Sequence, residues 1–271
     1  MIRSAHSVSD SHSAVASVHV ASFFLMLALS VVLAPPLAAT VIVSTDIHAS
    51  NIGITPSSGM VVFQTKWTAQ AYAQAQNSLG QFDAHFDTSV GGVAEASAIV
   101  AFADAEAEAM APIPNEDFAT SHINIPNVTA AASSLGRGTL FNTTFMITGG
   151  TGAVNVTFSV PLTTAQDLYT DDTGILATSE VVYSLLLDGN LVLFQDSSYQ
   201  IGPDTSLTVD FSGTLTATET LNFDQAYAIY EEVDSESSGI NVVPEPPSGS
   251  LALLGGGLFL VRRFLMAVRT G

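Results

Sequence analysis

Apolar and polar residues alternate with a period of two along most of the segment from Val41 to Tyr230. In residues 153–160, valine and phenylalanine occupy one face, while asparagine, threonine and serine occupy the other. The same alternation occurs in residues 141–147 and 207–211. Such a period is typical of strands with one buried and one exposed face. The pattern therefore predicts a body built largely of β-strands.

Two glycine-containing segments refine this prediction. The apolar runs Glu180–Leu187 and Leu191–Gln195 are separated by Asp188-Gly189-Asn190, and an Asp-Gly pair between two apolar runs predicts a hairpin. Gly213 interrupts the alternating run that begins at Leu207, so we expect a β-bulge there.

Two alanine tracts allow two interpretations. Every second residue is alanine in residues 69–75 and again in residues 101–109. Alanine is the best helix former, but a period of two scatters alanines around a helix and leaves no apolar stripe. On a strand the same period gives one small, smooth face. We favour strands, whose alanine faces would let two sheets approach closely.

These patterns predict about ten short strands in residues 40–230, with turn signals between them and few helical periods. The fold class that they favour is all-β, as a single antiparallel, jelly-roll-like β-sandwich domain. Residues 231–242 are acidic and polar, and we expect them to form a linker.

The charge distribution excludes one class of partner. All of the 25 acidic side chains except Asp10 and Glu245 lie in residues 40–242, where the basic side chains are only Lys66 and Arg137. Because such an acidic surface repels phosphate backbones, nucleic acid is not expected as a partner. The chain has no cysteine, so its stability does not depend on disulfides or thiolate metal sites.

The N-terminus has the layout of a signal peptide. An uncharged apolar run, Ala21–Ala34, is short for a membrane-spanning helix, and Pro35-Pro36 breaks it. The small residues Ala38 and Ala39 follow, so we expect signal peptidase to cut near Ala39 after export by the Sec machinery. Residues 1–39 are therefore assigned to a signal peptide. The alternative for the apolar run is a buried core helix.

The C-terminus combines three features in a fixed order. Val243-Pro244-Glu245-Pro246 comes first, and its prolines hold the chain extended and keep it out of helices and central strands. The apolar run Leu251–Val261 follows and, at about 1.5 Å per helical residue, spans roughly half of a hydrocarbon core. A basic group then stays on the cytoplasmic side; it comprises Arg262, Arg263 and Arg269. This layout predicts a temporary membrane anchor with an exposed segment just outside the membrane.

This arrangement of residues 243–271 resembles the PEP-CTERM sorting signal, in which a Pro-Glu-Pro motif, a short transmembrane helix and an arginine cluster close the chain. The resemblance implies that an exosortase-like membrane protease cuts near Pro244-Glu245-Pro246 and removes the tail. It further implies a Gram-negative-type envelope and delivery to the cell surface or an extracellular polysaccharide matrix. Pro247 and the eight residues after the arginine pair depart from the family pattern. The alternative is a plain C-terminal membrane tether.

Few residues of the body suggest metal or catalytic chemistry. His48, His85 and His122 form no i, i+4 pair, so we expect solvated or hydrogen-bonded surface histidines rather than metal ligands. No Gly-x-Ser-x-Gly elbow or phosphate-binding glycine loop occurs. Loop-like acids could bind Ca²⁺, although they form no Asp-x-Asp-x-Asp-Gly array, and no other cofactor is expected. These acids are Asp83, Asp87, Asp171, Asp172 and Asp188.

Three functions remain open at this point. The sequence favours a non-enzymatic exported protein with a structural or adhesive role in the cell envelope or biofilm matrix. A secreted carbohydrate-binding module is the alternative, since Trp67, Tyr72 and Phe82 could form a sugar-stacking platform, although core packing is favoured for them. A glycoside hydrolase comes third, because some of the many acids will lie at catalytic distance by chance.

Overall fold

The computed structural model describes residues 40–111, 115–126, 128–171 and 174–243. The described residues form fourteen strands and no helix, so no membrane-spanning helix is found among them. All pairings are antiparallel. The prediction of an all-β, sandwich-like body is confirmed at this level. All fourteen strands belong to residues 40–243 and lie within one compact unit.

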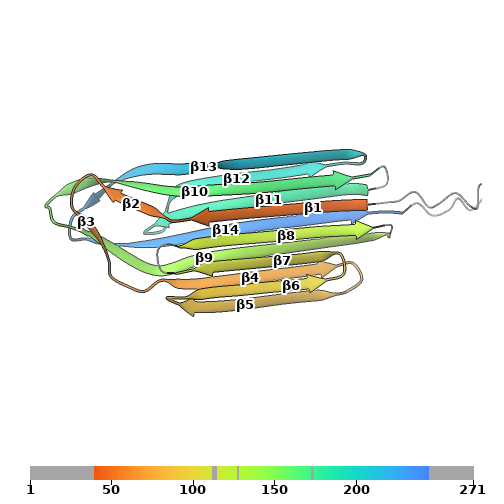
Figure 1. Ribbon diagram of the computed structural model, residues 1–271, viewed down its shortest axis with the longest axis horizontal. Coiled ribbons are helices and arrows are strands. Elements are labelled where there is room, and N and C mark those ends of the chain that lie inside the picture. Colours follow the sequence, from red (N-terminus) through yellow and green to blue (C-terminus); the bar gives the residue numbers. More distant parts are fainter. Residues whose placement is uncertain (1–39, 112–114, 127, 172–173, 244–271) are drawn as a thin grey trace, which may run out of the picture. The chain divides into compact units, whose positions relative to one another are not determined.

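The strands form two seven-stranded sheets, here called sheet A and sheet B (Figure 1). Sheet A has the order β13 (Thr205–Asn222), β10 (Ala153–Thr170), β1 (Thr40–Ser50), β8 (Glu116–Pro126), β7 (Ala103–Met110), β6 (Val93–Val100), and β2 (Gly53–Pro56) pairs with β10. Sheet B has the order β12 (Asn190–Ile201), β11 (Gly174–Leu187), β14 (Ala226–Asn241), β9 (Ala130–Thr148), β4 (Thr68–Asn77), β5 (Phe82–Val90), and β3 (Met60–Phe63) pairs with β9.

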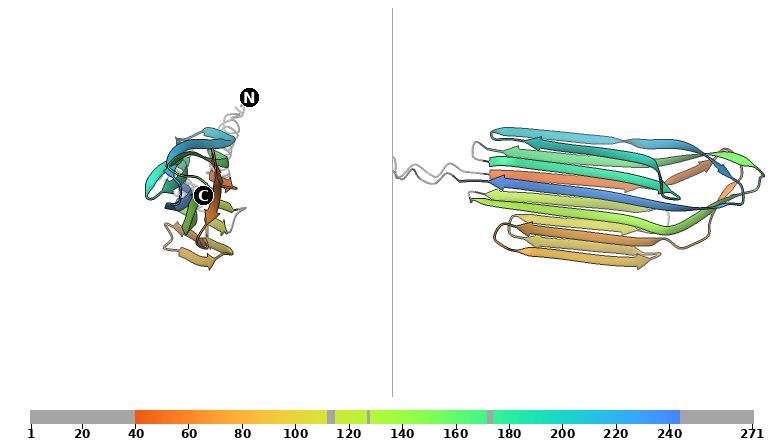
Figure 2. Two further views of the ribbon diagram at one scale, coloured as in Figure 1. Left: turned by 90° about the vertical axis from the view of Figure 1, so that its left-hand side faces the viewer. Right: turned by 180° about the vertical axis from the view of Figure 1, so that it is seen from behind.

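The two sheets lie face to face, and the end-on view in Figure 2 shows them as two layers. Each strand of sheet A contacts a counterpart in sheet B: β13 contacts β12, β10 contacts β11, β1 contacts β14, and β8 contacts β9. The series continues with β7 against β4 and β6 against β5. Alternate side chains of both inner faces interdigitate between the layers, as expected for stacked sheets.

The alanine tracts form strands, as predicted, and line the interface between β4, β6 and β7. The inward alanines are all buried; they are Ala69, Ala71, Ala73 and Ala75 on β4, Ala94, Ala96 and Ala98 on β6, and Ala103, Ala105, Ala107 and Ala109 on β7. Glycine takes over on β9, where a Cβ added to Gly136 would lie 2.5 Å from the Glu106 carbonyl oxygen and 2.7 Å from that of Thr120. Only side chains of this size allow the sheets to come so close.

Larger side chains fill the interface at the far end of β9 and β10. Phe145 packs against Phe158 with ring centroids 6.2 Å apart, and against Tyr227 at 5.9 Å. Phe63 from the short β3 covers this group and contacts Trp67 at 5.8 Å. Burial of such rings is the main source of stability in a core of this kind.

The hairpin predicted around Asp188-Gly189 is confirmed, since it joins β11 to β12. Both Asp188 and Gly189 have positive φ, at 49° and 80°, as a type I′ turn requires. The bulge predicted at Gly213 is wrong. Gly213 pairs with Leu162 in an unbroken register, and the ring of Phe211 lies beside it, where a Cβ would come within 3.0 Å. Glycine here makes room for that ring.

The linker predicted for residues 231–242 is also wrong, because this segment belongs to β14, a central strand between β11 and β9. Its acidic residues mostly face outward, and small polar residues face inward. The inward hydroxyl groups join a network between the sheets that we call the serine seam, comprising Thr45, Ser121, Ser179, Ser235 and Ser237. Because each hydroxyl finds a partner, the strand can bury polar side chains at little cost.

Candidate functional site

The described body extends to Val243, the first residue of the predicted sorting motif. β14 ends at Asn241, and the Val243 N–H donates to Thr129 Oγ1 at 3.0 Å. Gly239, near the end of β14, lies against Val41 at the start of β1, so the first and last strands begin and end at the same end of the sandwich (Figure 1). The chain is thus held to the fold up to the residue before Pro244.

The remaining predicted site residues lie outside the described residues. They are Pro244, Glu245 and Pro246 of the motif, Arg262, Arg263 and Arg269 of the basic group, and Ala38 and Ala39 of the signal-peptidase site. β1 begins at Thr40, one residue after the predicted cut.

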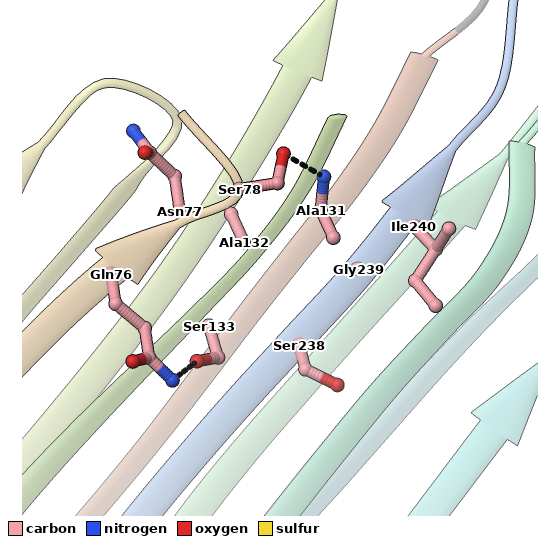
Figure 3. A pocket seen from close by; sticks show the side chains of 9 residues that line it. All are labelled: Gln76, Asn77, Ser78, Ala131, Ala132, Ser133, Ser238, Gly239 and Ile240. Atoms are coloured by element: carbon pink, nitrogen blue, oxygen red, sulfur yellow. Dashed lines mark hydrogen bonds between the residues drawn. The ribbon is translucent and has the colours of Figure 1, made fainter. Parts of the chain in front are cut away.

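A shallow hollow of about 350 Å³ lies on sheet B beside the end of β14 (Figure 3). Strands β4, β9 and β14 line it with small or neutral side chains. Ser78 Oγ accepts from the Ala131 N–H at 3.0 Å, and Gln76 Nε2 donates to Ser133 Oγ at 2.9 Å. Its other lining residues are Asn77, Ala132, Ser238, Gly239 and Ile240. None of these lining residues carries a charge.

Two carboxyl groups meet in the interior, Asp117 from β8 and Glu231 from β14, both 0% exposed. Tyr183 Oη donates to Glu231 Oε1 at 3.0 Å, and Asn115 Nδ2 donates to Glu231 Oε2 at 2.8 Å. The Met110 N–H reaches Asp117 Oδ1 at 3.3 Å. Asp117 Oδ2 has no hydrogen-bond partner among the described residues. Two ionised carboxylates buried beside each other would repel, so the pair favours keeping a proton.

The environment favours the protonated forms of this acid pair. Burial raises the pKa of Glu231 to about 7. Burial first, and then repulsion from Glu231, raise the pKa of Asp117 well above its usual value. Burial likewise raises the pKa of the Tyr183 hydroxyl, so that it stays a hydrogen-bond donor. The acid pair is chemically unusual, but a substrate cannot reach side chains that have no exposed surface, so it does not form a glycosidase site.

The three histidines lie apart, each beside one carboxylate. His48 Nε2 lies 2.7 Å from Glu116, and His122 Nδ1 lies 3.1 Å from Asp104. His85 lies 3.1 Å from Asp83. The prediction of hydrogen-bonded surface histidines is confirmed. The bond to Asp104 raises the pKa of His122.

Several of the acids considered for Ca²⁺ binding accept hydrogen bonds from backbone N–H groups. Asp83 and Asp87 accept the N–H groups of Ile99 and Glu95 on β6, at 3.0 and 3.2 Å. Asp188 accepts the Ala228 N–H at 2.7 Å. In the described ranges, no group of three or more histidine or acidic side chains has the geometry of a metal site.

The predicted aromatic trio does not come together. Trp67 is 2% exposed and belongs to the core, as the favoured alternative stated. Tyr72 and Phe82 face outward but have other cross-strand partners: Tyr72 pairs with Phe86, and Phe82 pairs with Gln76. The exposed aromatic row on this part of sheet B is therefore Phe82 and Phe86 of β5, with Tyr72 beside them.

Comparison with known proteins finds no matching family model, no similar curated protein and no similar solved structure. The function proposed below therefore depends on the residues of this chain alone.

Proposed function

We propose that this chain is an exported surface or extracellular-matrix protein that carries a PEP-CTERM-type sorting signal. Signal peptidase removes residues 1–39 after Sec-dependent export. The C-terminal segment then holds the protein briefly in the cytoplasmic membrane, until an exosortase-like protease cuts near Pro244-Glu245-Pro246. The released body has a structural or adhesive role in the envelope or biofilm matrix, where extracellular polysaccharide is a possible partner. The jelly-roll-like form of its sandwich remains part of this proposal.

The observation that carries the proposal is the ordered sequence of motif, apolar run and arginines after Val243. Its position relative to the fold supports it. Val243 is the last described residue and its N–H is bonded to Thr129, so the described body extends up to the proposed Pro-Glu-Pro segment. Proline at positions 244 and 246 prevents β14 from continuing as a central strand. A protease can therefore grip this segment without unfolding the domain.

The surface of the body supports an extracellular role without nucleic acid. The two basic side chains of residues 40–242 are Lys66 and Arg137, and Arg137 is committed to Asp234, to which its Nη2 donates at 2.8 Å. The many outward acids keep the protein soluble and repel phosphate.

Replacing the motif glutamate tests the sorting proposal. Glu245→Ala in the native host is expected to leave uncut protein in the membrane fraction, because the protease would lose the charged group between the two prolines. Glu236→Ala, which removes an exposed acid from β14, is the matched control and should be processed as usual. Immunoblots of membrane and extracellular fractions report both. Normal trimming and release of Glu245→Ala would refute the processing assignment.

A hollow of about 460 Å³ on sheet B favours carbohydrate binding as a second candidate function. It lies where the register between β9 and β14 shifts, and such irregularities often shape binding sites. Phe141 and Tyr230 provide rings against which a sugar could stack, and Asn142 and Thr144 provide polar groups. Rings combined with a few polar groups suit one or two sugar units.

A glycan array with residues 40–243 tests this second function. Tyr230→Ala is expected to reduce binding of any retained glycan by at least about tenfold, because it removes one ring from the hollow. Phe194→Ala, which removes an exposed ring from β12, should bind as wild type. If no glycan is retained, or both variants bind equally well, the hollow is not a sugar site.

A further inference from the structure

The edge strand β5 differs from the other three edge strands of the sandwich. It lies at the margin of sheet B, where β4 is its partner (Figure 1). Its outward residues alternate as Phe82, Ala84, Phe86, Thr88 and Val90, so none of them is charged. Phe82, Phe86 and Val90 are 63%, 61% and 64% exposed. In so acidic a protein, an uncharged row of large apolar side chains at a sheet edge needs an explanation.

The three other long edge strands each carry an acid on the outward face; β2 and β3, which also pair on one side only, are four residues long. These acids are Glu95 on β6, Asp196 on β12 and Asp210 on β13. Charged residues on an edge prevent another strand from pairing with it. The contrast between β5 and these strands therefore separates one permissive edge from three protected ones.

The charged residues of β5 lie on its inner face. Asp83 and Asp87 point to the other face, where they accept backbone N–H groups of β6. His85 lies beside Asp83 on that same face. β5 also contains no lysine or proline, and its register with β4 has no bulge. Of the usual devices that block edge-to-edge pairing, β5 keeps only its inward-pointing charges and has no outward charge, lysine, proline or bulge.

We propose that β5 pairs with β5 of a second copy of this chain. An antiparallel arrangement with a two-fold axis at Phe86 places Phe86 opposite its own equivalent and Phe82 opposite Val90. Every outward contact in that register is apolar or neutral, and cross-strand apolar pairs stabilise sheets. An interface that uses the same patch on both copies closes as a dimer. A second copy is the favoured occupant because this edge matches itself in register and in lack of charge. At the other long edges, the outward acids of two copies would repel each other.

Pairing of this kind would join two B sheets into one continuous sheet. It deepens the structural role proposed above by naming a partner, which is another copy of the chain. It does not depend on how the chain is exported or cut, so failure of either proposal leaves the other open to its own test.

Analytical ultracentrifugation of residues 40–243 tests the dimer. Wild type is expected to show a concentration-dependent monomer–dimer equilibrium. Phe86→Lys should raise the dissociation constant at least about tenfold, because it places two like charges opposite each other. Phe194→Lys makes the same change on β12, the other edge of sheet B, and should dimerise as wild type. Circular dichroism and thermal unfolding verify that each variant is folded.

A mixing experiment tests the register. Phe86→Lys and Phe86→Glu should each be monomeric alone and should form a mixed dimer together, because the two-fold axis places lysine opposite glutamate. A wild-type protein that stays monomeric, a Phe86→Lys variant that still dimerises, an equal loss in Phe194→Lys, or a mixture that fails to pair would each overturn the proposal.

Discussion

Residues 40–243 are expected to be more stable in mildly acidic buffer than at neutral pH, because of the acid pair Asp117–Glu231. The pKa of Glu231 rises from 4.5 to about 7 on folding, so the folded state keeps a proton that the unfolded chain releases. Stability from this proton is complete below pH 4.5 and is lost as the pH rises toward about 7. The loss amounts to about 3 kcal/mol of unfolding free energy. The raised pKa of Asp117 adds a loss of the same sign, because the folded state also holds this proton more tightly than the unfolded chain does.

Glu231→Gln isolates this effect. The amide cannot ionise and its oxygen can accept from Tyr183, but its NH₂ group then faces the Asn115 NH₂ group that donates to Glu231 in wild type. We therefore expect the variant to lose most of the pH dependence between pH 4.5 and 7, with a loss of stability at all pH values from the two facing donors. Glu236→Gln, on the exposed face of the same strand, should keep the wild-type slope. Urea unfolding at several pH values measures how the unfolding free energy of each variant depends on pH. Wild-type stability that stays level or rises from pH 4.5 to 7 would contradict the account.

Gly136→Ala is expected to lower the unfolding free energy by about 2–3 kcal/mol, through overpacking. The added Cβ would lie 2.5 Å from the Glu106 carbonyl oxygen and 2.7 Å from that of Thr120, both on sheet A. Neither backbone atom can rotate away, so the sheets must separate along the alanine-lined interface. That separation exposes apolar surface and weakens close contacts.

Gly202→Ala provides the matched control, because nothing lies within 4 Å of its added Cβ. It should change the unfolding free energy by less than about 0.5 kcal/mol. Thermal and urea unfolding of both variants compare the two sites. Equal stability of Gly136→Ala and Gly202→Ala would show that the sheets are not in close contact at β9.

Much of the strand structure could be predicted from local pattern. The alternation of residues 153–160, the Asp188-Gly189 turn and the alanine tracts each reflect a constraint within one segment, so the sequence reveals them directly. The linker prediction for residues 231–242 was wrong because the inward side chains of this strand are mostly polar. Glu231 is acceptable inside because Asn115 and Tyr183 donate to it. Ser235 and Ser237 are acceptable because hydroxyl groups of the other sheet bond to them. A hydropathy pattern cannot distinguish such a strand from a solvated linker.

The candidate sites also differ in whether a local sequence pattern reveals them. The proposed sorting motif could be recognised from sequence because its three parts are contiguous in the chain, and the structure describes the body as far as Val243, which bonds to Thr129. The acid pair was missed, since its members are far apart in sequence and neither has a distinctive local motif. The exposed row on β5 was missed too. Trp67, Tyr72 and Phe82 were expected together because all three are aromatic, whereas the register of β4 and β5 places Phe86 beside Tyr72.

Intact-mass analysis of the protein purified from its native host tests the central claim most directly. Export with removal of both end segments predicts a mature chain that begins near Thr40 and ends no later than about Pro247, apart from any group that replaces the tail. Fully exported molecules that still contain Arg262 and Arg263 would contradict it.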